Sequence, residues 1–127
     1  MGMYTEFFFR AELKEDAPTE IVNFLNQWFN GEHVQLQIPD HEFFTKDRWE
    51  ALLAGGSAYF PGVPRSSFQK EYRTWEIGIH SNLKNYGQEI DYFLDWIEPY
   101  VRGYKGKFLG YSLYEESEQP HLYWKRT

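Results

Sequence analysis

The chain has 127 residues, of which a fifth are aromatic and none is cysteine, and its formal net charge is −6. This length predicts one domain over residues 1–127, and the lack of cysteine excludes disulfides, thiolate chemistry and cysteine-based zinc sites. The acidic balance argues against sequence-independent nucleic-acid binding, which needs a basic surface. No apolar run is long enough for a signal peptide or a membrane span. We therefore expect a cytoplasmic protein, with Met1 and Gly2 ahead of a natural start at Met3.

The first element is predicted by an alternating pattern over 5–13, in which Thr5, Phe7, Phe9, Ala11 and Leu13 share one side. Phe7 and Phe9 share one side of this segment, and Phe8 lies on the other with charged neighbours. This pattern is typical of a half-buried strand with its odd-numbered side chains facing the core.

A helix is predicted next, over about 17–30, because apolar residues recur there at helical spacing. Asp16 is its expected N-cap and Gly31 its expected end. Alternation over 33–38 then predicts a second strand.

The middle of the chain predicts a short helix followed by three strands. Thr45 is the expected cap of a helix over 46–54, and 57–60 is a short strand. Two longer alternating segments, 66–72 and 74–83, predict a hairpin.

The last third of the chain predicts a helix over about 88–100 and a terminal hairpin of 107–116 and 121–125. The helix has the clearest amphipathic pattern in the sequence. Its expected core-facing residues are Ile90, Phe93, Leu94, Ile97 and Val101.

Hairpins dominate this order of elements, which predicts an α+β two-layer sandwich. The sheet should be mostly antiparallel, with the two main helices packed on one face. The other face would carry aromatic rings whose identity depends on the strand register, namely Tyr4, Phe8, Tyr111, Tyr114 or Tyr123.

The familiar catalytic and metal-binding patterns are missing. The four histidines are far apart and form no i, i+4 pair, so the zincin pattern is absent. The segment 40–42 (Asp-His-Glu) contains metal-ligand types, but a lone cluster of that kind favours a solvated loop. No serine stands in a glycine-flanked elbow, and Asp91, Asp95 and Glu98 fit the polar face of a helix. We therefore predict no catalytic residues, no metal and no cofactor.

One basic island stands out in this acidic chain, formed by Arg65, Lys70 and Arg73. Together with the turn over 82–87, it could hold a phosphate or a carboxylate. The alternative is a sheet edge that its charges protect from pairing with other chains.

Tyr92, Trp96 and Tyr100 repeat at intervals of four on the last helix. They could extend its buried face or form a subunit interface, since tyrosine and tryptophan are enriched at interfaces. These rings and the terminal hairpin over 108–124 are the two candidate patches for an expected homodimer.

The expected binding site lies where loops rich in glycine, proline and asparagine meet aromatic strands. No residue pair in it identifies a reaction. The predicted ligand-binding residues are Tyr59, Arg65, Arg73, Trp75, His80, Asn82, Tyr86 and Tyr111.

Three stretches together carry a resemblance. They are 58–62 (AYFPG), 82–86 (NLKNY) leading into 90–97 (IDYFLDWI), and 108–116 (FLGYSLYEE). They resemble small uncharacterised proteins encoded by bacteriophages, especially those of actinobacteria. The resemblance covers about the last two-thirds of the chain and implies an accessory phage product, with no activity or site residue to carry over.

We favour a non-enzymatic binding protein whose aromatic surface engages a host protein or a small ligand. One alternative is a small enzyme for a phosphate-containing or nucleotide-like ligand, with His80 as acid or base near the basic island. A histidine–carboxylate pair in a pocket would favour that alternative. Another is an acidic decoy of nucleic acid, which carboxylates spaced like phosphates along one face would favour.

Overall fold

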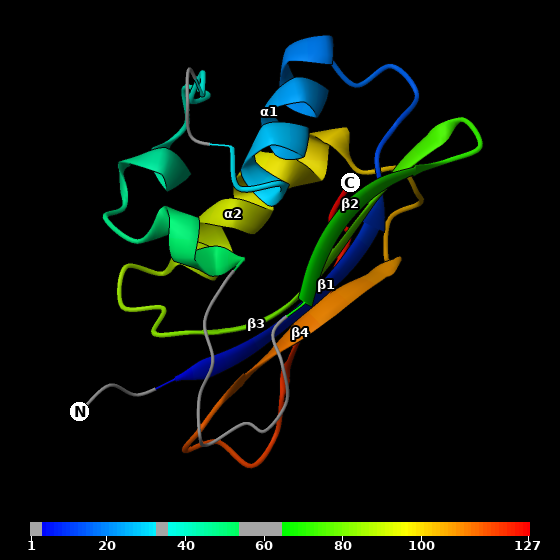
Figure 1. Ribbon diagram of the computed structural model, residues 1–127. Coiled ribbons are helices and arrows are strands. Elements are labelled where there is room, and N and C mark those ends of the chain that lie inside the picture. Colours follow the sequence, from blue (N-terminus) through cyan, green and yellow to red (C-terminus); the bar gives the residue numbers. More distant parts are fainter. Residues whose placement is uncertain (1–3, 33–35, 54–64) are drawn as a thin grey trace.

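The computed structural model describes residues 4–32, 36–53 and 65–127, and its strands form one antiparallel sheet in the order β2-β3-β1-β4-β5. Two helices lie on one face of that sheet, so the expected α+β two-layer sandwich is confirmed (Figure 1). The β-α-β-β-α-β order of the first main elements is that of ferredoxin-like folds, extended here by β5. The elements are β1 (Thr5–Glu12), α1 (Thr19–Phe29), η1 (Glu42–Thr45), η2 (Trp49–Leu52), β2 (Arg65–Glu71), β3 (Thr74–Leu83), α2 (Glu89–Ile97), η3 (Glu98–Tyr100), β4 (Phe108–Tyr114) and β5 (His121–Trp124).

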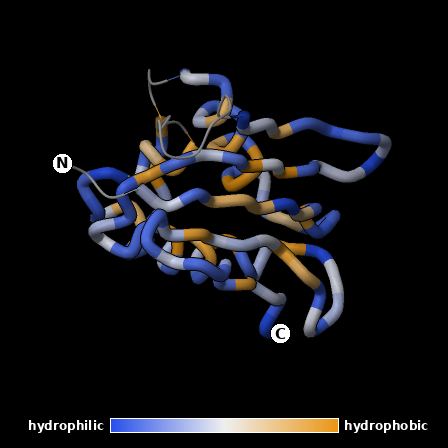
Figure 2. The backbone as a smooth tube through the Cα atoms, turned by 90° about the horizontal axis from the view of Figure 1, so that it is seen from below, coloured by the Kyte–Doolittle hydropathy of each residue, from blue (hydrophilic) through white to orange (hydrophobic). Residues whose placement is uncertain are grey.

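The core lies between the helices and the inner face of the sheet, as the alternation in the first strand predicts. Phe7 and Phe9 of β1 are fully buried, and the ring of Phe93 on α2 packs edge-on against both of them. Buried and less buried side chains alternate along β1, and the strands carry both hydrophobic and hydrophilic residues (Figure 2). The central strand is thus fixed by rings from the helical layer.

The expected stripe of α2 is buried, and Trp96 is buried with it. Trp96 is 4 % exposed, and its ring stacks on Phe43 of η1 with centroids 6.2 Å apart. Tyr92 and Tyr100 are half-buried against the same core. The structure therefore favours the buried alternative for the rings of this helix, and Trp96 cannot be an exposed interface residue of the folded chain.

The prediction of a helix over 46–54 is wrong, because no α-helix forms in the described part of this segment. Two short 3-10 helices, η1 and η2, lie over 42–52 instead, and residues 46–48 between them belong to neither. Its apolar pair Trp49 and Leu52 is spaced by three residues, which suits a 3-10 turn as well as an α-helix. Thr45 donates its hydroxyl to the carbonyl of Glu42 and caps no helix.

Two further predictions fail in the first third. Residues 36–38 form no strand, and 33–35 lie outside the described residues. Pro18, not Asp16, occupies the N-cap of α1, with no side-chain cap. The proline ring holds φ at −57° while ψ is 141°, so the chain stays extended at Pro18 and the helix begins directly after it.

The outer face of the sheet is covered by no helix of the described chain (Figure 1). The strand register places Phe8 and Tyr111 on this face, whereas Tyr114 and Tyr123 belong to the inner side. Within the described residues, no helix has the length and apolar character needed to cross a membrane.

Candidate functional site

A hollow of about 930 Å³ opens on the outer face of the sheet. It spans the central strands, and its floor is the backbone and outward side chains of β1, β2 and β3. Its size falls in the range of small-molecule binding sites. Outward-facing residues that line it include Phe8, Arg10, Glu12, Arg65, Ser67, Gln69, Glu76, Gly78, His80 and Phe108.

Gly78 gives this hollow its depth. It lies in the interior of β3, opposite Arg10 of β1 and Ser67 of β2. A Cβ atom added at Gly78 would meet only the Ser67 hydroxyl, at 3.3 Å. The pairing of β3 with β1 and with β2 continues through Gly78 without a bulge, and the φ angle of Gly78 is not positive. The backbone therefore does not need glycine here, and the missing side chain leaves open space.

A wall of rings stands beside Gly78. Phe8 stacks on Tyr111 with centroids 5.5 Å apart and an interplanar angle of 13°. His80 meets Phe8 edge-on at 6.2 Å. These three residues are direct cross-strand neighbours on β3, β1 and β4, so their order follows from the register.

Glu6 joins the two ends of this wall. Its Oε2 lies 2.7 Å from His80 Nε2, and the side chains of Glu6 and His80 are 17 % and 44 % exposed. The pKa of Tyr111 is raised from 10.0, first by burial and then by the negative charge of Glu6 and a hydrogen bond to it. Glu6 can therefore orient both His80 and Tyr111 toward the open face.

Replacing Glu6 with glutamine should lower the pKa of Tyr111 toward 10.0 while leaving it raised, because burial remains. A raised tyrosine pKa stabilises the fold below pH about 10, and that contribution is lost as the pH rises through the folded-state pKa. NMR titration of ¹³C-labelled tyrosine would measure the shift. Glu12→Gln, farther along the same strand, is the control, and an unchanged Tyr111 pKa in Glu6→Gln would refute the contact.

Positive and negative side chains both line the hollow, and they occupy different positions along the strands. Arg65 lies directly opposite His80, and Arg10 opposite Gly78. Glu12 and Glu76 lie opposite each other one step farther along the strands. Lys107 also lines the hollow, so three cations face two carboxylates in a protein of net charge −6.

The structure brings together His80, Tyr111 and Arg65 of the expected ligand-binding set. Trp75 faces the opposite side of the sheet, where it stacks on Phe68 with centroids 4.6 Å apart, because it is adjacent in sequence to the outward residue Glu76. Tyr59 lies outside the described residues.

Three other members of the set lie away from the hollow. Arg73 is in the β2–β3 turn, and Tyr86 is in the loop before α2. Asn82 follows His80 on the outward side of β3, but it is only 6 % exposed, and its buried Oδ1 has no hydrogen-bond partner within the described residues. The set therefore does not form one site.

Sequence reasoning missed Phe8, Arg10, Ser67 and Gly78 as site residues. The alternation in the first strand carries a signal for Phe8 and Arg10, because it already turns them outward. A glycine in the middle of a strand is a second signal, since glycine weakens a strand and often marks a close approach.

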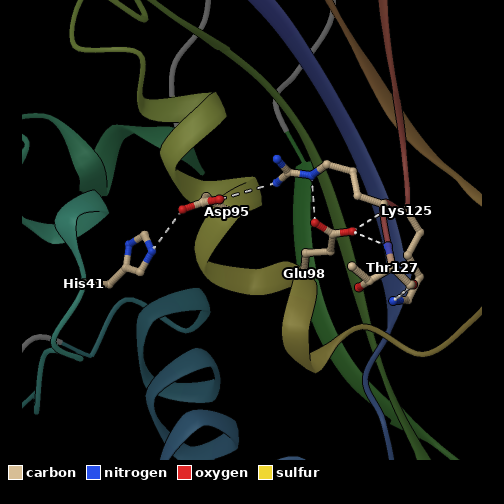
Figure 3. Close-up of polar contacts among 6 residues, drawn as sticks. His41, Asp95, Glu98, Lys125 and Thr127 are labelled. Carbon is tan, nitrogen blue, oxygen red and sulfur yellow. Dashed lines mark hydrogen bonds and ion pairs between the residues drawn. The ribbon is translucent and has the colours of Figure 1, made fainter. Parts of the chain in front are cut away.

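A second polar cluster joins α2 to the end of the described chain (Figure 3). Asp95 lies 3.6 Å from both His41 Nε2 and Arg126 Nη2. Glu98 accepts hydrogen bonds from Arg126 Nε at 2.8 Å and from the Arg126 and Thr127 amides. His41 Nδ1 accepts from the amide of Phe43 and so caps η1. These contacts hold the fold together, and no three metal-ligand side chains converge within the described residues.

The hollow on the outer face is therefore the candidate site of this chain, and its geometry rests on register, ring stacking and the space above Gly78. No protein-family model, curated protein or solved structure matches the chain.

Proposed function

We propose that this protein is a binding protein and that its ligand or partner lies on the outer face of the sheet. The observation that carries the proposal is the wall of Phe8, Tyr111 and His80 beside the hollow above Gly78. Aromatic surface that the described fold leaves open is typical of a binding site. The resemblance to phage proteins supports an accessory role in the cytoplasm, with a host protein or a small ligand as the partner.

An aromatic fragment screen by NMR tests this proposal. Fragments with one or two rings should shift the amide signals of Phe8 and Gly78, because those residues line the open space. Phe8→Ser should remove the shifts. Tyr104→Ser, which removes an exposed ring that does not line the hollow, should keep them. Fragments that bind only at other residues, or none that bind at all, would refute an outer-face site.

We also propose that the protein is a homodimer and that β5 is its interface. β5 is one edge of the sheet, and its residues Leu122 and Trp124 are 43 % and 50 % exposed. Phe108 on the neighbouring strand β4 is 43 % exposed. The other edge strand, β2, carries Arg65, Lys70 and Glu71. Charge on an edge strand opposes pairing with another chain, and β5 has no Asp, Glu, Lys or Arg.

Sedimentation at micromolar concentration should therefore show about twice the chain mass of 15.3 kDa. Leu122→Lys should give a monomer, because it places a charge on the paired edge. Gln69→Lys makes the same kind of change on the outward side of β2 and should leave the dimer intact. A parent protein that is monomeric at every concentration would contradict this interface.

The contact between His80 and Glu6 supports an enzyme as a second candidate. A carboxylate that holds a histidine is a common arrangement for a general base, and Arg65 opposite His80 could bind a phosphate group. His80→Gln would then abolish turnover but keep binding. The acidic decoy has less support, because Arg10 stands between Glu6 and Glu12 on the outward side of β1.

A further inference from the structure

We infer that the hollow above Gly78 binds a nucleotide, that is, an aromatic ring joined through a sugar to a phosphate. This inference rests on the proposed binding function and names the chemical class of the ligand. It follows from the space, the rings and the order of charges on the outer face.

The space comes from a residue that the backbone does not require. Glycine in a strand interior costs stability, because it loses more conformational freedom on folding than other residues. A bulge or a positive φ would explain it, but Gly78 has neither. The remaining explanation is close approach of another group to the backbone. At Gly78 that group must come from the open side, because β1 and β3 already bury their inner face.

The rings beside this space suit a planar group. Phe8 and His80 line the hollow; the Phe8 ring meets His80 edge-on and is stacked on Tyr111, so the three rings form one aromatic cluster at its side. Bases stack on such aromatic side chains, which gives affinity without selecting one base. A purine or pyrimidine ring is therefore well matched to the wall.

The cations lie where a phosphate attached to that ring could reach them. Arg65 is opposite His80 and Arg10 is opposite Gly78. Neither arginine forms an ion pair within the described part of the chain. A guanidinium binds phosphate in a two-pronged geometry that a lysine does not reproduce.

The carboxylates complete the polarity of the site. Glu12 and Glu76 face each other across β1 and β3, next to Gly78 and away from His80. Like charges directly opposite each other are unfavourable unless a partner lies between them. Sugar hydroxyls donate hydrogen bonds and would be such partners, as in dinucleotide-binding folds, where a carboxylate binds the ribose. We therefore place the phosphate at Arg65 and Arg10 and the donor groups at Glu12 and Glu76.

Isothermal titration with AMP and GMP tests this assignment, with adenosine and ribose 5-phosphate as the two halves of the ligand. At least one nucleotide should bind about tenfold or more tightly than either half, because only the whole molecule contacts both rings and arginines. Arg65→Gln should weaken nucleotide binding about tenfold or more. Arg73→Gln, which changes the other arginine of the basic island but lies in the turn, should bind like the parent.

Filling the hollow is the second arm of the experiment. Gly78→Val should weaken nucleotide binding about tenfold or more while the melting temperature stays equal or rises, since valine favours strands. If Gly78→Val does not fold, Gly78→Ala takes its place. The inference is overturned if neither nucleotide binds at millimolar concentration, or if the filled hollow binds as tightly as the parent. Aromatic fragments that still map to Phe8 and Gly78 in that case would leave the binding function standing, whereas their absence would refute both.

Discussion

Replacing Phe93 with alanine should lower the free energy of unfolding by about 3–5 kcal/mol. The Phe93 ring is fully buried, and it contacts Phe7 and Phe9 of the central strand at 6.2 and 5.4 Å between centroids. Its loss would open a cavity between the two layers that neighbouring rings cannot close without leaving their own contacts. Urea denaturation followed by circular dichroism would measure the change.

Phe108→Ala is the matched control, because the Phe108 ring is 43 % exposed at the outer face. Phe108→Ala should lower the free energy of unfolding much less than Phe93→Ala, because folding buries less of the Phe108 ring. If Phe93→Ala unfolds at the same urea concentration as the parent, α2 does not anchor the sheet as described.

Replacing Gly110 with alanine should destabilise the protein by about 3 kcal/mol or more. Gly110 of β4 pairs with Phe9 of β1 next to a register shift. An added Cβ would collide with the backbone carbonyl of Phe8 and lie 2.9 Å from Phe9 Cα. Backbone of the central strand cannot move aside as a side chain can, so the β1–β4 pairing must open. Urea denaturation again measures the loss.

Gly78→Ala should have the opposite sign, although Gly78 is also a strand glycine. Its added Cβ meets only the flexible hydroxyl of Ser67, and alanine restricts the unfolded chain. We expect a gain of about 0.5–1 kcal/mol. Equal effects at Gly78 and Gly110 would show that neither glycine has the role assigned to it.

The sequence was sufficient to predict the layers of this fold, because each layer depends on one local pattern. Alternation turns Phe7 and Phe9 inward, and helical spacing turns Ile90 and Phe93 toward them. It was insufficient between 36 and 53, where segments are short. There, Trp49 and Leu52 are buried by 3-10 turns whose geometry depends on the packed rings around them.

The candidate site was predictable only in part, because register joins residues that are distant in sequence. His80 and Tyr111 carried a local signal, being polar or aromatic residues on strands. Their connection through Phe8 and Glu6 depends on β1 lying between β3 and β4, which no local pattern specifies. Gly78 could be recognised from the sequence as a glycine inside a strand. Its role in the hollow depends on Arg10 and Ser67, which lie opposite it on the neighbouring strands.

The central place of β1 also determines when this chain can fold. β1 comes first along the chain, yet its partners come late: Thr5 pairs with Leu83 on one side and with Tyr114 on the other. Contacts that far apart in sequence slow the search for the native state. During synthesis, β1 can therefore complete its pairing only after the segment up to Tyr114 has left the ribosome, and until then its apolar residues are exposed to chaperones and to aggregation.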